Sequence, residues 1–178
     1  GSLGAALSTM VANLSSHKQG WDARWEEFSD WAEKGKACMT ELLALVDKDT
    51  DAFNAIMASW RLPAATSAEK TAKQEAIQAA VHQAIAVPFR IMEVSLASME
   101  VADAMAEKGL SASASDAGVA ALCARAAVRG AYLNVCINTS DLEDKAACSD
   151  FLERGSALVE SAKLKEAQIL TKVEAYFS

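Results

Sequence analysis

Proline and glycine are scarce, with 2 prolines and 8 glycines in 178 residues. These two residues disrupt helices most strongly, so their scarcity leaves long stretches free to form helix. The 38 alanines add high helix propensity along most of the chain, and no segment reads convincingly as a strand. The sequence therefore predicts an all-α fold.

Cysteine and histidine are also few, and their spacing argues against a zinc site. The 4 cysteines form no C-x-x-C pair, and only 2 histidines accompany them. A structural zinc site needs about four such ligands at characteristic spacings. We expect reduced, packed thiols, no bound metal and no tightly bound cofactor.

Basic residues are outnumbered, with 17 Lys and Arg against 24 Asp and Glu and a net charge of −7. This balance argues against binding to nucleic acid or to an anionic membrane surface, because both require a basic face. No apolar run approaches the roughly 20 residues of a membrane span, and no signal-peptide pattern opens the chain. We therefore expect a cytoplasmic protein. We also expect a single domain, since 178 residues of which 52% are hydrophobic are ample for one core.

Apolar residues recur at helical spacing in several segments separated by polar breaks. Helices are predicted near residues 1–14, 21–60, 68–105, 117–135 and 142–176, and Pro88 is expected to kink or divide the third. Short connections favour antiparallel neighbours. The predicted architecture is an up-and-down bundle of five to six helices, kinked at Pro88.

The second predicted helix carries an apolar stripe that includes Val46, Phe53 and Trp60 and that we expect to face the core, and one carboxylate interrupts its register. Asp49 occupies a position that is otherwise apolar, and a buried ionised carboxylate is costly unless it is paired. It is either a paired structural group or an acid in a functional site. Asp47 and Asp51 share another face and fit a solvated acidic patch.

Two further polar groups stand in apolar surroundings. Ser115 and Asp116 precede a predicted helix, where a helix cap is the simpler interpretation. Asn134 and Asn138 lie one helical turn apart, and such amides either cap a neighbouring backbone or bind a ligand.

Several segments, in order, resemble the cyclodeaminase domain of the formiminotransferase-cyclodeaminase family. The resemblance covers about residues 1 to 160. The segments that carry it are Gly1-Ser2-Leu3-Gly4-Ala5-Ala6-Leu7 with Met10-Val11, Asp47-Lys48-Asp49 with Ala52-Phe53, Arg61-Leu62-Pro63, Ala86-Val87-Pro88-Phe89, Ser115-Asp116, and Gly130-Ala131-Tyr132-Leu133-Asn134-Val135-Cys136-Ile137-Asn138.

The resemblance implies one cyclodeaminase-like helical domain over residues 1–178, lacking the family's N-terminal glycine-rich segment. It implies closure of 5-formiminotetrahydrofolate to 5,10-methenyltetrahydrofolate with release of ammonia, in histidine degradation and one-carbon metabolism. The family also includes methenyltetrahydrofolate cyclohydrolases, so hydrolysis of the methenyl bridge is the alternative. A non-catalytic helical interaction protein is the second alternative.

The resemblance also assigns roles to the polar residues. Asp49 and Asp116 become the acid/base and cation-stabilising groups, with Asp47 as a third choice. Ser115, Asn134 and Asn138 would bind the pterin or orient the carboxylates, and Lys18 and Lys73 would pair with the glutamate tail. The implied partners are a folate, in its polyglutamylated form, and a separate formiminotransferase. The implied assembly is a homodimer or larger oligomer, to which Trp21, Trp25 and Trp31 contribute.

Overall fold

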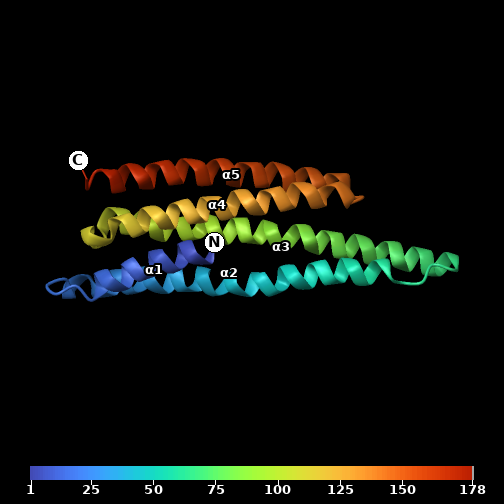
Figure 1. Cartoon of the computed structure of the whole chain (residues 1–178), viewed down its shortest axis with the longest axis horizontal. Coiled ribbons are helices and arrows are strands. Elements are labelled where there is room, and N and C mark those ends of the chain that lie inside the picture. The colour runs from blue at the N-terminus through green and yellow to red at the C-terminus, as the bar shows by residue number, and fades with distance from the viewer. Residues whose placement is uncertain (178) are drawn as a thin grey trace.

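Five helices make up the fold of the computed structural model, which describes residues 1–177 (Figure 1). They are α1 (Ser2–Ser16), α2 (Trp25–Trp60), α3 (Ser67–Lys108), α4 (Ala114–Asn138) and α5 (Lys145–Glu174). Three single 3-10 turns lie in the connections, at Asp22–Arg24, Ser111–Ser113 and Thr139–Asp141, and no strand occurs in residues 1–177. The prediction of an all-α bundle of five to six helices is confirmed.

Helix α3 lies at the centre of the bundle. It contacts α1, α2, α4 and α5, and α1 also packs against α2 and α4. The core is built mainly from alanine, valine and methionine side chains, including Met92, Met99 and Met105 on α3. Small residues allow close approach: the position of a Cβ on Gly4 of α1 lies 2.7 Å from the backbone oxygen of Ala120.

Helix α1 covers only part of the groove between α2 and α4 (Figure 1). Gly1, which precedes α1, lies against Leu42, and past that level the predicted apolar stripe of α2 is uncovered. Val46, Phe53 and Trp60 belong to this stripe and are 54% to 62% exposed, so their assignment to the core is wrong. Asp49 lies between them and is exposed rather than buried.

The helix starts differ from the predicted ones in detail. Helix α3 is continuous through Pro88 rather than divided there, and its N-cap is Thr66, which forms a capping box with Glu69. Helix α4 begins at Ala114, so Ser115 and Asp116 lie in its first turn and do not cap it. The cap of α5 is Asp144, whose carboxylate accepts hydrogen bonds from the backbone N–H groups of Ala146 and Ala147.

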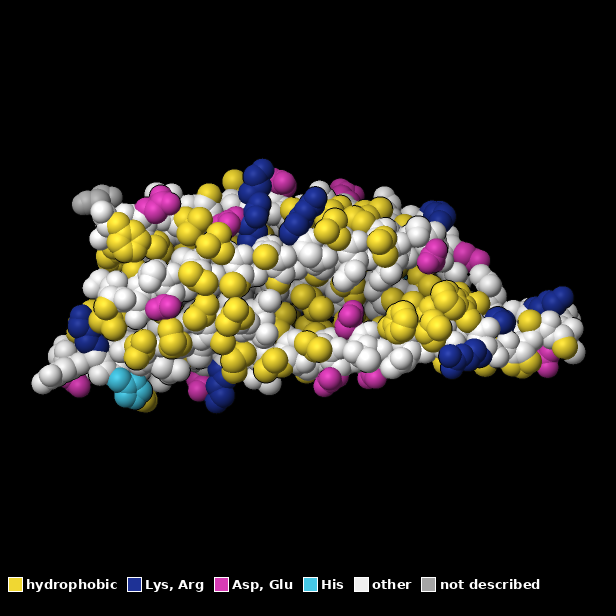
Figure 2. Space-filling view, viewed as in Figure 1, with side chains coloured by type: hydrophobic (Ala, Val, Ile, Leu, Met, Phe, Trp, Pro, Cys, Tyr) yellow, Lys and Arg dark blue, Asp and Glu magenta, His cyan; other side chains and the backbone are white. Residues whose placement is uncertain are grey.

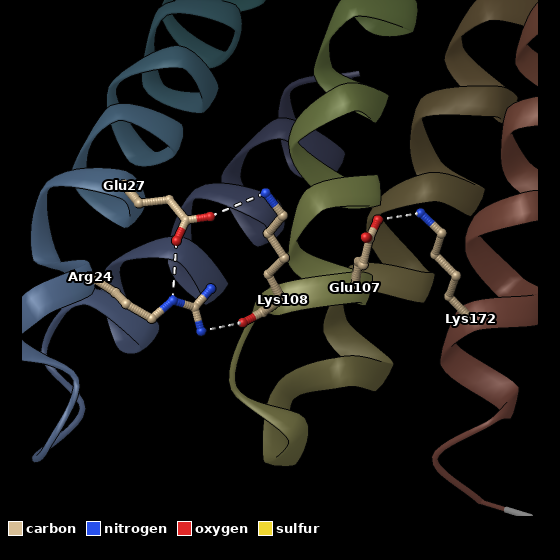
Figure 3. Close-up of polar contacts among 5 residues, drawn as sticks. All are labelled: Arg24, Glu27, Glu107, Lys108 and Lys172. Atoms are coloured by element: carbon tan, nitrogen blue, oxygen red, sulfur yellow. Dashed lines mark hydrogen bonds and ion pairs between the residues drawn. The ribbon is translucent and has the colours of Figure 1, made fainter.

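Ion pairs tie three helices together at one end of the bundle (Figure 3). Glu27 of α2 accepts from Arg24 and from Lys108 of α3, at 3.1 and 3.2 Å. These two donors hold the pKa of Glu27 below its ordinary value. On the other side of α3, Lys172 of α5 pairs with Glu107 at 2.9 Å.

One segment meets the length and composition of a membrane span, although no such span was predicted from the sequence. It runs over Ser111–Asp141, and 33% of its most apolar window is buried inside the structure. A core helix of a soluble bundle meets the same criteria, and α4 contacts α1, α3 and α5. The unusual feature of α4 is therefore that its outward face is apolar as well.

Candidate functional site

A hollow opens between α2 and α4 beyond the N-terminal end of α1 (Figure 2). A cavity of about 180 Å³ there gathers three of the residues predicted to be functional, Asp49, Asn134 and Asn138. Ala52, Phe53 and Ile56 of α2 and Ala84 of α3 complete its lining. Asn134 and Asn138 follow Asp49 by 85 and 89 positions in the sequence, so the fold brings distant residues into one site.

The orientation of Asn138 is fixed by a backbone carbonyl of α3. Its Nδ2 donates to the oxygen of Ala84 at 2.7 Å. In a regular helix that oxygen would accept from the N–H of the residue four positions later, which is Pro88 and has no N–H. The amide of Asn138 takes the missing donor's place, and its Oδ1 is left as a hydrogen-bond acceptor.

Asn134 has no comparable restraint. Its side chain makes no hydrogen bond to any residue in the described range 1–177 and is exposed. One turn of α4 thus presents two amides, one held in place and one free to bind.

The cavity continues into a wider one of about 500 Å³ toward the end of α2. The two share Phe53, Ile56 and Asn138. The wider cavity adds Trp60, Ile77 and Val81 as apolar lining, and its polar lining is Gln74, Gln78, Asp141 and Glu143. Phe53 is 62% exposed and Trp60 54%, so aromatic faces are available to a planar ligand.

Gln78 holds the connection between α4 and α5 against α3. It donates to the backbone oxygen of Asp141 at 3.2 Å and accepts from the backbone N–H of Glu143 at 2.8 Å. Gln74 donates to the Glu143 carboxylate at 2.6 Å. The wall of the wider cavity is therefore tied to α3 by side-chain hydrogen bonds.

The lining of both cavities is acidic and neutral. It contains three carboxylates, Asp49, Asp141 and Glu143, four amides, and neither Lys nor Arg among its described residues. Carboxylates favour a ligand that carries or develops positive charge, and amides match the donor and acceptor edge of a heterocycle. The site therefore fits a polar planar ring that becomes cationic.

Asp116 and Ser115 lie far from these cavities, at the other end of α4. Asp116 is 18 residues before Asn134 on the same helix, which corresponds to about 27 Å at 1.5 Å per residue. It is half-buried in the first turn of α4, and Ser115 beside it is exposed. The structure therefore does not bring Asp116 to Asp49 within one chain.

The two predicted tail-binding lysines have other contacts. Lys73 donates to the backbone oxygens of Trp60 and Leu62, at 2.6 and 3.0 Å, and so caps the end of α2. Lys18 lies beyond the C-terminal end of α1, with its Nζ 4.1 Å from the centre of the Trp21 ring. Asp47 is exposed and lines neither cavity.

Sequence reasoning missed the aromatic and amide lining of the wider cavity. Phe53 and Trp60 were assigned to a buried stripe, and Gln74 and Gln78 were not singled out. Their spacing of four residues on one face of α3 is the signal that pairs them. Among the described residues, no group of three or more His, Cys, Asp or Glu side chains is arranged to hold a metal ion.

Residues 1–157 match the family model described as formiminotransferase-cyclodeaminase. A methenyltetrahydrofolate cyclohydrolase from Methylorubrum extorquens is 36% identical over 167 residues, which cover 93% of this chain and 80% of that protein. The formimidoyltransferase-cyclodeaminase of Sus scrofa is 32% identical over 173 residues. That match covers 97% of this chain but only 32% of the Sus scrofa protein.

A solved structure shares the fold. The formiminotetrahydrofolate cyclodeaminase of Thermotoga maritima superposes with a TM-score of 0.85 at 23% identity. The match covers 99% of this chain and 84% of that one. The arrangement of the five helices is therefore that of a known fold.

Proposed function

Because the chain belongs to the formiminotransferase-cyclodeaminase family, we propose that it is a folate enzyme acting on the one-carbon bridge of tetrahydrofolate. The reaction we propose is cyclodeamination of 5-formiminotetrahydrofolate to 5,10-methenyltetrahydrofolate. The observation that carries the proposal is the cavity that joins Asp49, Asn134 and Asn138 beside exposed aromatic rings and without a cation in its lining.

The proposed reaction forms a bond from N10 of the folate to the formimino carbon and breaks the bond from that carbon to the departing nitrogen. The formimino group reacts as its protonated amidinium, the proton of N10 passes to the departing nitrogen, that nitrogen leaves as NH3, and the positive charge stays on the product ring. We assign to the carboxylate of Asp49, which lines the cavity, the transfer of the N10 proton to the leaving amine. The same negative charge stabilises the developing amidinium.

The other lining residues bind and orient the ring. The amides of Asn134 and Asn138 match a heterocyclic edge that both donates and accepts hydrogen bonds. Phe53 and Trp60 offer faces for stacking. The glutamate tail is anionic, so we expect it to leave the cavity rather than to lie among Asp141 and Glu143.

Hydrolysis of methenyltetrahydrofolate to 10-formyltetrahydrofolate is the second candidate. It is favoured by the 36% identity to a protein named as a cyclohydrolase, over 80% of that protein's length. In this reaction Asp49 would remove a proton from the water that attacks the cationic methenyl carbon. The two candidates use the same site and differ in the leaving group and the nucleophile.

The absorbance of methenyltetrahydrofolate distinguishes the two. Growth of its band from formiminotetrahydrofolate, with ammonia released, supports cyclodeamination. Accelerated loss of the band from methenyltetrahydrofolate, with no formimino activity, supports hydrolysis. No change with either substrate, in protein that is folded by circular dichroism, would leave the non-catalytic interaction protein as the better interpretation.

Two variants test whether Asp49 carries the reaction. We expect Asp49→Asn to lower kcat by about 100- to 10,000-fold, the range typical of a general acid or base. Asp51→Asn is the matched control, since Asp51 is two residues away, exposed, and lines neither cavity. Equal activity of both variants would remove Asp49 from the mechanism.

The cellular setting follows from the proposed chemistry. We place the enzyme in the cytoplasm, in one-carbon metabolism and in the folate-dependent stage of histidine degradation. Its formimino substrate would be supplied by a separate formiminotransferase, and the substrate would carry a polyglutamate tail. The enzyme would require no tightly bound cofactor and would act as a homodimer or larger oligomer.

A further inference from the structure

The two cavities of the candidate site lie end to end between α2 and α4, which run in the same direction (Figure 1). The α2 residues that line them follow one another at steps of four, three and four positions, so they share one face of that helix. They are Asp49, Phe53, Ile56 and Trp60. Hydrophobic side chains gather at the Trp60 end of this groove (Figure 2). The cavities therefore form one elongated groove with an apolar and aromatic wall on α2.

The opposite wall of the groove is a line of polar side chains. Asn134, Asn138 and Asp141 follow one another at steps of four and three positions, and the 3-10 turn Thr139–Asp141 continues α4 without a break. Asn134 lines the narrow cavity and Asp141 lines the wider one, while Asn138 lines both. The groove thus has a carboxylate near each end, Asp49 and Asp141, and two amides along its length.

The Asp141 carboxylate has acceptor capacity to spare. Among residues 1–177 its hydrogen bond comes from the hydroxyl of the neighbouring Ser140, at 3.3 Å, and neither Lys nor Arg pairs with it. The other carboxylate of this wall, Glu143, is already engaged, because Gln74 donates to it at 2.6 Å. An ionised carboxylate offers about four acceptor positions, so Asp141 can receive two further donors.

The backbone that carries Asp141 is held by side-chain hydrogen bonds. Gln78 of α3 donates to the Asp141 backbone oxygen at 3.2 Å and accepts from the N–H of Glu143 at 2.8 Å. The Ser140 hydroxyl also donates to the oxygen of Ile137, at 2.8 Å. Both ends of the Gln78 amide are used in this way, which makes Gln78 a positioning residue for Asp141.

We propose that Asp141 binds the edge of the folate pterin ring that carries N3–H and the 2-amino group, and that Gln78 positions Asp141 for this contact. The proposal rests on the proposed function, which supplies the ligand. Two parallel N–H donors match the two oxygens of a carboxylate, and hydrogen bonds to an ionised group are stronger than neutral ones. Asp141 thereby determines specificity for the ring, while Asp49 acts on the one-carbon bridge.

This contact fixes the direction of the substrate in the groove. In a pterin, N5 and the arm to N10 lie on the ring opposite to the one that carries the 2-amino group. With the 2-amino edge at Asp141, the reacting nitrogens point toward Asn134 and Asp49, and Asn134 lies seven residues, or about 11 Å, back along the helix. The bicyclic ring then lies between Phe53 and Asn138, which line both cavities.

The same direction accounts for the charge of the groove. The glutamate tail is attached beyond N10, so it is directed away from the wall that carries Asp141 and Glu143. The neutral donor edge of the ring meets the acidic wall instead. Attraction of the donor edge and repulsion of the tail therefore favour one orientation of the substrate.

Binding of folic acid tests the contact without turnover. An analogue with a methyl group in place of the 2-amino group lacks one of the two donors. We expect the wild type to bind folic acid about 10- to 100-fold more tightly than this analogue, as for a hydrogen bond to a charged group. Asp141→Asn should lower this preference by about tenfold, because a neutral amide replaces the charged acceptor. An equal preference in the wild type and Asp141→Asn overturns the contact.

Glu75→Gln is the matched control for charge. Glu75 is exposed on α3 next to Gln74 and lines neither cavity, so its substitution removes one negative charge near the groove without removing a contact. We expect the preference for folic acid over the analogue to remain as in the wild type. A loss as large as that of Asp141→Asn would show that net charge is the cause, and it would overturn the assignment of Asp141.

Gln78→Met tests the positioning role. It removes both hydrogen bonds to the α4–α5 connection and keeps a side chain of similar length. We expect the preference for the 2-amino group to fall as in Asp141→Asn, and KM for the substrate to rise with kcat nearly unchanged, because the ring contact is the same in the ground state and the transition state. A folded Gln78→Met that keeps the wild-type preference overturns the positioning role.

Binding and turnover together separate this contact from the proposed function. A wild type that prefers folic acid as expected but converts neither folate refutes the proposed reaction and leaves the Asp141 contact standing. A wild type that converts a folate but shows no preference for the 2-amino group overturns the contact alone. A wild type that neither binds nor converts a folate overturns both.

Discussion

The hydrogen bond from Asn138 to Ala84 should depend energetically on Pro88, although Pro88 does not take part in it. Pro88 has no N–H to donate to the Ala84 oxygen, and the Asn138 Nδ2 donates there instead at 2.7 Å. In a Pro88→Ala variant the backbone N–H is restored, so the Ala84 oxygen regains its regular helical partner. The side-chain hydrogen bond then becomes redundant.

The expected magnitude follows from the surroundings of the carbonyl. Asn138→Ala leaves the Ala84 oxygen without a donor, and loss of one partner of a buried hydrogen bond costs about 1–3 kcal/mol. Because Ala84 lines a cavity that is open to water, we expect a value near the lower end, about 1 kcal/mol. In the Pro88→Ala background, Asn138→Ala should lower the free energy of unfolding by less than about 0.5 kcal/mol, which is the size of the error in additivity for independent sites.

The assay is a double-mutant cycle measured by urea unfolding. Wild type, both single variants and the double variant are compared at one fixed protein concentration, because association would make stability depend on concentration. The cycle cancels the packing lost with the buried Pro88 ring, which occurs in both of its arms. Additive costs for the two substitutions would refute the idea that Asn138 replaces the donor that Pro88 lacks.

Three further predictions concern caps, packing and pH. Thr66→Ala should lower the free energy of unfolding by about 1 kcal/mol, because it removes the N3 hydrogen bond of the α3 capping box, and Thr71→Ala is the control in the same helix. Gly155→Ala should destabilise the fold by about 1–3 kcal/mol, since the new Cβ would lie 2.8 Å from the Tyr132 ring, and an unchanged urea midpoint would contradict this packing. Arg24 and Lys108 lower the pKa of Glu27, so ionised Glu27 stabilises the fold. The difference in the free energy of unfolding between wild type and Glu27→Gln should be fully present above pH 4.5 and should vanish as the pH falls through the lowered pKa. A difference that persists at pH 2 would show that charge is not its cause.

The pattern of the sequence was sufficient for the helices and for part of the site. Five helical segments follow from apolar spacing and from the scarcity of glycine and proline, and the structure has five helices. Asp49, Asn134 and Asn138 were recognised as polar groups in apolar surroundings and share one cavity. The interpretation of Asp49 as a buried carboxylate was wrong, because periodicity reports which residues share a face but not whether another helix covers it.

The wider cavity could not be found in this way. Trp60 and Gln74 lie on different helices, and they line one cavity only because α2 and α3 pack side by side beyond the N-terminal end of α1. The hydrogen bonds of Gln78 to the α4–α5 connection span more than 60 residues. Local patterns carry no information about such separations.

The sequence by itself determined the fold class, the helices and the chemical character of the groups available, because helix propensity and apolar spacing are local properties of the chain. Tertiary structure alone decided which of those groups meet. It left the Val46, Phe53 and Trp60 stripe in solvent because α1 begins at the level of Leu42. It joined Asp49 to the α4 amides across a groove, and it held Asp116 at the other end of α4, because a helix rises 1.5 Å per residue and separates groups that share one face.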